Sequence, residues 1–153
     1  MREFLFRGKR KVDGEWVVGD SILRFRDGGT FIVHGGKASV KDMELRALMD
    51  SVFMGVLPET IGQYTGLTDK NGTKIFEGDI VKATVIQNLW SKTRKYTAIF
   101  VVEYHEKYCY FYLKRERNNL LFDGNWSYGV FIDEVIGNIH DDPELMEGGP
   151  TDV

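Results

Sequence analysis

Residues 58–81, PETIGQYTGLTDKNGTKIFEGDIV, contain two turn signals in close succession and decide how the chain folds. The first, DKNG at residues 69–72, supplies Asp, Asn and Gly where a reversal needs a positive φ or a side-chain bond to the backbone. The second, EGD at residues 77–79, predicts a tighter corner. Residues 73–76 allow only a short extended piece, and residues 80–86 are typical of a strand. This stretch therefore folds the front of the chain onto the back.

The composition is that of a globular chain with many turns. The sequence has 153 residues, of which 42% are hydrophobic, and its 17 Gly against 3 Pro favour numerous tight turns over disorder. A chain of this length is one domain by default and buries a sizeable core. The net charge of −3 argues against a general attraction to phosphate groups.

The single cysteine, Cys109, excludes an internal disulfide. Its apolar setting, YCYFY, predicts a buried structural thiol. No apolar run approaches the length of a membrane span, and the first ten residues lack the hydrophobic region of a signal peptide. We therefore expect a cytoplasmic location and no membrane partner.

The N-terminal part predicts a β-rich layer. Strands are expected at residues 3–7 and 16–20, and a hairpin is expected from residues 21–25 and 30–34 around the DGG turn at 27–29. A basic group follows the first strand and consists of Arg7, Lys9, Arg10 and Lys11.

Residues 41–53 are the one good helix candidate. Their apolar stripe at helical spacing consists of Leu45, Leu48, Met49, Val52 and Phe53. Ser39 is a suitable N-cap. The alternative is a helix that ends near Asp50, followed by a strand over residues 51–57.

Residues 80–139 predict five short strands, with no room for crossover helices. Such spacing suggests a small barrel or sandwich, and a barrel also removes exposed strand edges. The strands are expected at residues 80–89, 97–105, 108–114, 120–122 and, in two pieces, 130–132 with 134–139. A short helix is expected to begin at Asp142, with Pro143 at its first position.

Several separated motifs together carry a family resemblance. They are PETIGQYTGL at residues 58–67, DKNG at 69–72, IFEGDIV at 75–81, EVIGNI at 134–139 with DPEL at 142–145, and FRGK at 6–9 with GEWV at 14–17. The combined run resembles the YopX family. The residues of this signature that we interpret as structural turns are Pro58, Gly62, Gln63, Tyr64, Gly66, Asp69, Asn71, Gly72, Glu77, Gly78 and Asp79.

The resemblance implies a small protein encoded mainly by phages and prophages, with an SH3-type β-barrel roll and no established activity. The expected fold is therefore mainly β: an SH3-like barrel from about residue 73 to residue 140, behind an N-terminal β-rich layer with one short helix. The expected regions are residues 1–57, 58–147 and a flexible tail at 148–153, or a single domain over residues 1–147.

The sequence shows no catalytic constellation. His34, His105 and His140 are scattered, and with a single Cys they do not make a zinc site. The DKNG turn fails the calcium-loop template, and no phosphate-binding loop is present. We therefore expect no enzyme activity, metal or cofactor. The alternative is a weak hydrolase with an unrecognised carboxylate site.

The most suggestive surface is the basic and aromatic loop WSKTRKY at residues 90–96. Cations between aromatic rings suit single-stranded nucleic acid, because bases stack on the rings and the cations neutralise phosphates. The candidate residues are Trp90, Lys92, Arg94, Lys95 and Tyr96, with Lys114, Arg115 and Arg117 as a second cluster at the same end of a barrel. We nevertheless favour the interpretation that this loop is an ordinary solvated hairpin tip over the interpretation that it binds nucleic acid.

We rank a protein partner, from a host or a phage, above nucleic acid, because the chain is acidic. Self-association is a further prediction, through the apolar run at residues 99–102 on a predicted edge strand.

Overall fold

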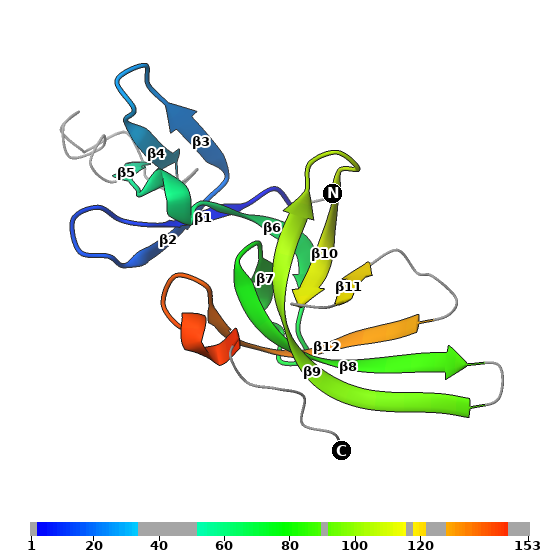
Figure 1. Cartoon of the computed structure of the whole chain (residues 1–153). Coiled ribbons are helices and arrows are strands. Elements are labelled where there is room, and N and C mark those ends of the chain that lie inside the picture. Colours follow the sequence, from blue (N-terminus) through cyan, green and yellow to red (C-terminus); the bar gives the residue numbers. More distant parts are fainter. Residues whose placement is uncertain (1–2, 34–51, 90–91, 116–117, 122–127, 147–153) are drawn as a thin grey trace. The chain divides into compact units, whose positions relative to one another are not determined.

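The computed structural model describes residues 3–33, 52–89, 92–115, 118–121 and 128–146 (Figure 1). The chain divides into two compact units, residues 1–66 and 67–153. The boundary lies within strand β6 (Gly62–Thr68). The mainly β fold expected from the sequence is confirmed. Within the described residues, no helix is long and apolar enough to cross a membrane.

The N-terminal unit contains two small antiparallel sheets. In one, β1 (Phe6–Lys9) lies between β2 (Trp16–Gly19) and the start of β6. The strands of the other, in spatial order, are β3 (Ser21–Arg24), β4 (Thr30–Val33) and β5 (Phe53–Gly55). Ile32 and Val56 are fully buried in this unit.

A short 3-10 helix, η1 (Pro58–Thr60), leads into β6. The Thr60 hydroxyl accepts a hydrogen bond from the Lys9 backbone N–H at 2.9 Å and donates one to the Leu57 carbonyl at 2.7 Å. One threonine therefore ties η1 to β1.

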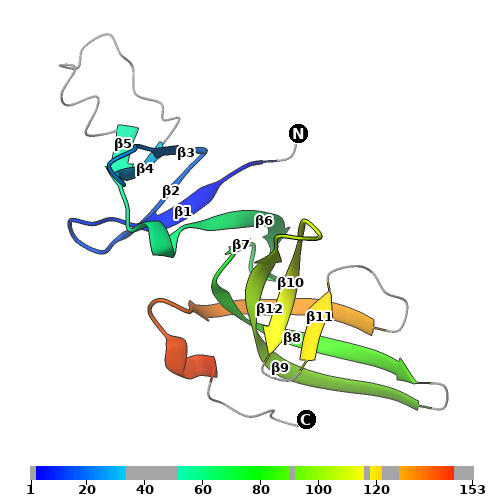
Figure 2. The same ribbon diagram turned by 45° about the horizontal axis from the view of Figure 1, so that its top comes forward.

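The C-terminal unit is built on a five-stranded antiparallel sheet that curls into a half-barrel (Figure 2). Its strands, in spatial order, are β11 (Asn118–Leu121), β10 (Tyr110–Arg115), β9 (Lys92–His105), β8 (Asp79–Leu89) and β12 (Tyr128–Asn138). The curl is consistent with the SH3-like expectation. The buried core of the unit consists of Ile75, Val81, Ala83, Val85, Ala98, Phe100, Val102 and Leu113.

The DKNG turn forms as predicted and connects β6 to β7 (Lys74–Phe76). The Asp69 carboxylate accepts backbone N–H bonds from Asn71 at 2.8 Å and Thr73 at 2.9 Å on one oxygen, and from Val135 of β12 at 3.1 Å on the other. The Lys70 N–H also donates to the Asp133 carbonyl at 3.3 Å. The turn thus holds the last strand as well as reversing the chain.

These donors set the ionisation of Asp69. Burial by itself would raise the pKa of this carboxyl group, but the N–H groups of Val135, Thr73 and Asn71, with the Thr73 hydroxyl, outweigh burial and hold the pKa below its ordinary value of 3.8. Asp69 is therefore ionised at neutral pH.

The second corner, at Gly78, is also confirmed. Gly78 has a φ of 82°, a value that a side chain would disfavour. The Asp79 carboxylate accepts the Phe76 N–H at 2.7 Å across this corner.

Part of the turn assignment is wrong. Gly62, Gln63, Tyr64 and Gly66 lie in strand β6, whose first two residues pair with β1 and in which Tyr64 is buried. Gly66 nevertheless has a positive φ of 89°, which favours glycine there. Pro58 begins the 3-10 helix η1.

The helix expected at residues 41–53 falls mostly on residues 34–51, outside the described part of the chain, as does the tail at 148–153. At its end, Val52 is helical and Phe53 begins strand β5, so the strand of the alternative is present over residues 53–55 but starts later than residue 51. The short helix at the C-terminal end is present as the 3-10 helix η2 (Pro143–Met146).

The expectation for Cys109 is wrong, because its side chain is exposed. The residue ends the four-residue turn between β9 and β10, with a left-handed φ of 56°, and its N–H donates to the His105 carbonyl at 2.8 Å. The turn is two residues longer than the expected Glu106–Lys107 reversal.

Candidate binding face on the β9–β10 hairpin

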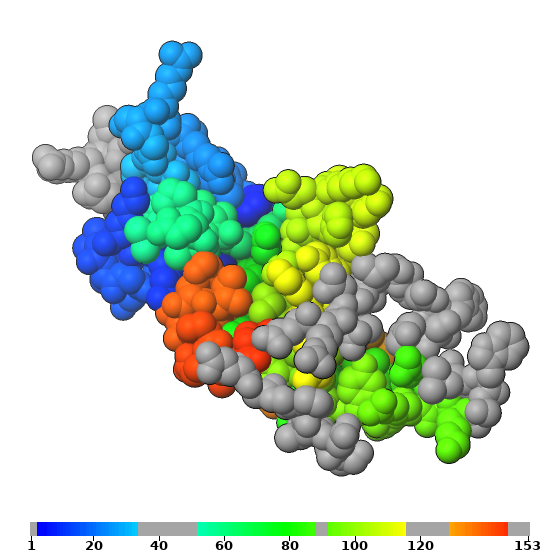
Figure 3. Space-filling model, in the orientation of Figure 1, coloured from blue at the N-terminus to red at the C-terminus, as the bar shows by residue number. Residues whose placement is uncertain are grey.

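The β9–β10 hairpin continues past the end of β8. The pairing of β8 with β9 begins at Ile80 and Val101, whereas the pairing of β9 with β10 extends to His105 and Tyr110. In the space-filling view, this end of the hairpin, in yellow-green, stands at the surface of the C-terminal unit (Figure 3).

Strand alternation divides the side chains of this hairpin between two faces. Tyr110 lies opposite His105, and Tyr112 lies opposite Glu103, so these four side chains share one face. Phe111 lies on the other face, where its ring packs 5.1 Å from that of Tyr104 and against the core. The core residues on one side therefore fix the aromatic residues on the other.

Four rings form a continuous aromatic group on the first face, which we call the tyrosine face: His105, Tyr108, Tyr110 and Tyr112. The His105 ring centre lies 4.8 Å from Tyr108, 5.3 Å from Tyr110 and 5.9 Å from Tyr112. The rings of Tyr108 and Tyr110 are almost parallel, at 7°, with centres 6.1 Å apart. Tyr108 is 58% exposed.

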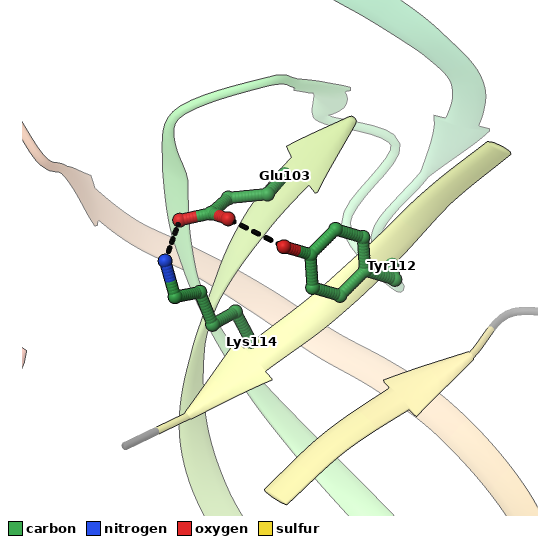
Figure 4. Close-up of polar contacts among 3 residues, drawn as sticks. All are labelled: Glu103, Tyr112 and Lys114. Atoms are coloured by element: carbon green, nitrogen blue, oxygen red, sulfur yellow. Dashed lines mark hydrogen bonds and ion pairs between the residues drawn. The ribbon is translucent and has the colours of Figure 1, made fainter. Parts of the chain in front are cut away.

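A charged pair closes the far end of the tyrosine face (Figure 4). The Tyr112 hydroxyl donates to Glu103 Oε2 at 2.6 Å, and Lys114 Nζ contacts Glu103 Oε1 at 2.8 Å. The hydrogen bond to Glu103, then burial and the negative charge of Glu103 raise the pKa of Tyr112 to about 12. The carboxylate therefore holds Tyr112 in its neutral form and fixes its ring.

The titration of Tyr112 provides a direct test of this geometry. The pKa of Tyr112 in the folded protein is raised above the ordinary value of 10.0. The contribution of its hydrogen bond with Glu103 to the free energy of unfolding is therefore complete below pH 10 and is lost as the pH rises toward 12. We expect ultraviolet titration of the tyrosines to show one group at about 12 in the wild type. In Glu103→Gln that group should move toward 10, whereas Tyr108→Phe should leave it in place. An unchanged titration in Glu103→Gln would contradict the assignment.

The face can supply a large contact area at low cost in entropy. Tyrosine has two side-chain torsions, and these rings are already packed on one another, so little freedom is lost on binding. At the turn, the Lys107 ammonium lies 5.0 Å from the centre of the Tyr108 ring. Aromatic residues of this kind are enriched in protein interfaces.

The structure places the predicted basic residues differently from the sequence interpretation. Lys92 to Tyr96 lie in strand β9, paired with β8 from Leu89 to Val85, and do not form a loop. By alternation, Lys92 and Arg94 share a face with Tyr96, whereas Lys95 lies on the opposite face. The Arg94 guanidinium lies 5.5 Å from the centre of the Tyr96 ring. Trp90 lies outside the described residues.

The second basic cluster does not join the first. Lys114 pairs with Val101 in register, and Val101 lies seven residues along β9 from Arg94. At 3.3–3.4 Å a residue the separation is roughly 23 Å. Arg115 ends β10, and Arg117 lies outside the described residues.

The predicted edge at residues 99–102 is also wrong. These residues lie in β9, between β8 and β10, so their backbone groups are paired within the sheet.

The tyrosine face was not identified from the sequence. Its signal is the alternation of Tyr108, Tyr110 and Tyr112 with Phe111 and Leu113, which is typical of a strand with one aromatic surface and one core surface. Among the described residues, no group of three or more His, Cys, Asp or Glu side chains is arranged to hold a metal ion.

Comparison with known proteins agrees with the resemblance of the motifs. The family model of the YopX protein matches residues 5–147. The chain belongs to the YopX family. No curated protein matches this YopX family member. A crystal structure of protein EF1440 from Enterococcus faecalis is similar at 25% identity and a TM-score of 0.44, covering 94% of this chain and 97% of that one.

Proposed function

We propose that this YopX family member is a non-catalytic binding module, and that the tyrosine face binds a protein partner. The observation that carries the proposal is the packed group of His105, Tyr108, Tyr110 and Tyr112 at the end of the β9–β10 hairpin, where Tyr108 is 58% exposed. Such pre-ordered aromatic groups supply much of the binding energy of protein interfaces.

The charge around this face favours a polypeptide over nucleic acid. The C-terminal unit has ten basic and fourteen acidic residues, a formal net charge of −4. Glu103 lies on the tyrosine face itself and is paired with Lys114, which reduces the attraction of that cation for phosphate.

The proposal is tested with a random peptide library displayed on phage. We expect the wild-type protein to enrich peptides that bind at micromolar or lower concentration, and we expect Tyr108→Ser/Tyr110→Ser to lose binding to them by at least about tenfold. Phe131→Ser is the matched control, because Phe131 is equally exposed, at 59%, but lies on β12. Enrichment that survives the tyrosine substitutions, or an absence of enrichment, would reject the tyrosine face as the binding site.

The single-stranded nucleic acid alternative at Lys92, Arg94 and Lys95 stays a prediction. It requires binding of a labelled strand that weakens with salt and loses part of its salt dependence in Arg94→Ala/Lys95→Ala. The absence of catalysis also stays a prediction, as does self-association, which would need a surface other than residues 99–102 because these lie inside the sheet. A hydrolase and nuclease screen tests the first, and light scattering at high concentration tests the second.

A further inference from the structure

The N-terminal unit has a second surface where cations and an aromatic ring meet. Lys9 of β1 lies opposite Trp16 of β2, and Arg7 lies opposite Val18, so these four side chains share one face of the sheet. The Arg7 guanidinium carbon is 4.8 Å from the centre of the Trp16 ring, and Lys9 Nζ is 5.7 Å from it.

Part of this face is open to solvent. β2 is the edge strand of its sheet, and Val18, next to Trp16 on the same face, is 39% exposed. On the other side of β1, the residue paired with Arg7 is Gly62, which adds no side chain above the sheet. An indole and a valine at an edge, with two cations beside them, are the parts of a stacking platform.

The end of β1 and the turn that follows it add further positive charge next to this face. Within residues 7–11, RGKRK, only Gly8 is uncharged. Asp13 is paired with Arg10 at 2.8 Å, and alternation places Arg10 on the opposite face from Lys9. The N-terminal unit as a whole has ten basic and nine acidic residues, a net charge of +1, so the acidity of the chain belongs to the C-terminal unit.

We propose that the face formed by Arg7, Lys9, Trp16 and Val18 binds single-stranded nucleic acid. A base stacks on Trp16 and packs against the apolar side chain of Val18, and the adjoining phosphates are neutralised by Arg7 and Lys9. This inference is independent of the proposed protein partner, because it concerns another unit and another class of ligand.

The test uses the full chain and a fluorescein-labelled oligothymidylate strand of about 16 nucleotides, the upper end of the site size of one small β-barrel. Anisotropy is measured at about 50 mM and about 200 mM salt. We expect measurable affinity at low salt that falls as the salt rises. Trp16→Leu should weaken binding about tenfold or more, and Trp16→Phe should restore part of it because a ring is present again. Lys9→Gln should reduce the slope of log affinity against log salt concentration by about 1, the value expected for the loss of one phosphate contact.

Three results would overturn the inference. The first is an absence of binding at low salt. The second is a loss confined to Arg94→Ala/Lys95→Ala, which is the matched control because it removes two cations from β9 instead. The third is equal competition by inorganic phosphate or thymidine monophosphate, which would indicate a small-anion site instead of a strand-binding face. Because Lys9→Gln removes no aromatic ring, it keeps the test decisive if Trp16→Leu fails to fold.

Discussion

Replacing Asp69 by asparagine is expected to destabilise the C-terminal unit far more than its conservative shape suggests. The amide oxygen can still accept the N–H groups of Asn71 and Thr73. The amide nitrogen, however, would take the place of the oxygen that accepts the Val135 N–H, so that two donors face each other. The turn would then lose its bond to β12. The measurement is the urea midpoint, compared with that of the wild type.

The stability lost in Asp69→Asn should also depend on pH, and should be smaller in acid than at neutral pH. The pKa of Asp69 in the folded protein lies below its ordinary value of 3.8. The contribution of the ionised carboxylate to the free energy of unfolding is therefore complete at neutral pH and is lost as the pH falls through the lowered pKa. The gap between wild type and Asp69→Asn should therefore narrow in acid. The control is Asp27→Asn. Asp27 is exposed and accepts the Gly29 N–H at 2.9 Å, a bond within its own turn, so the effect of this substitution should be small. Equal effects of the two substitutions would contradict this account of Asp69.

Replacing Gly19 by alanine is expected to destabilise the N-terminal unit by about 3 kcal/mol, at the upper end of the usual range for overpacking. A Cβ atom at this position would overlap the Val33 carbonyl oxygen and would lie 2.5 Å from Ile32 Cγ2. The oxygen belongs to the backbone of β4 and already accepts the Asp20 N–H at 3.1 Å, so it cannot move without breaking that bond. Urea denaturation followed by circular dichroism measures the loss.

Gly55→Ala is the matched control for Gly19→Ala. It also adds a methyl group to a strand of the same unit, but the nearest atom would be Phe31 Cε1 at 3.5 Å, an ordinary contact. Its stability should stay near that of the wild type, or rise slightly because alanine loses less backbone entropy on folding. A Gly19→Ala protein as stable as Gly55→Ala would show that β2 and β4 do not approach as closely as described.

Local sequence signals predicted local structure well in this chain. The DKNG and EGD turns were predicted because Asp and Asn bond to backbone groups only a few residues away, and because Gly allows a positive φ at its own position. The strands around the β9–β10 hairpin were predicted because alternation is also a local pattern. The second role of Asp69, as an acceptor for Val135, could not be predicted, because its partner lies 66 residues further along the chain.

The surface features of the C-terminal unit were predicted wrongly for a similar reason, because they depend on how distant segments pair. The side chain of Cys109 is exposed because the residue lies in the turn, which is two residues longer than expected, so that β10 begins only at Tyr110. Strand order is equally non-local, so the apolar run at residues 99–102 looked like an edge although it is central. The basic residues at 92–96 looked like one cluster, but strand geometry divides them between two faces.

The most direct test of the central claim is amide chemical-shift mapping with a peptide selected on the wild-type protein. The account predicts saturable shifts concentrated at His105 to Tyr112, with little change in β1 and β2. Saturable shifts that instead cluster at Lys92 to Tyr96, or that leave the β9–β10 hairpin unchanged, would contradict the assignment of the tyrosine face as the protein-binding surface.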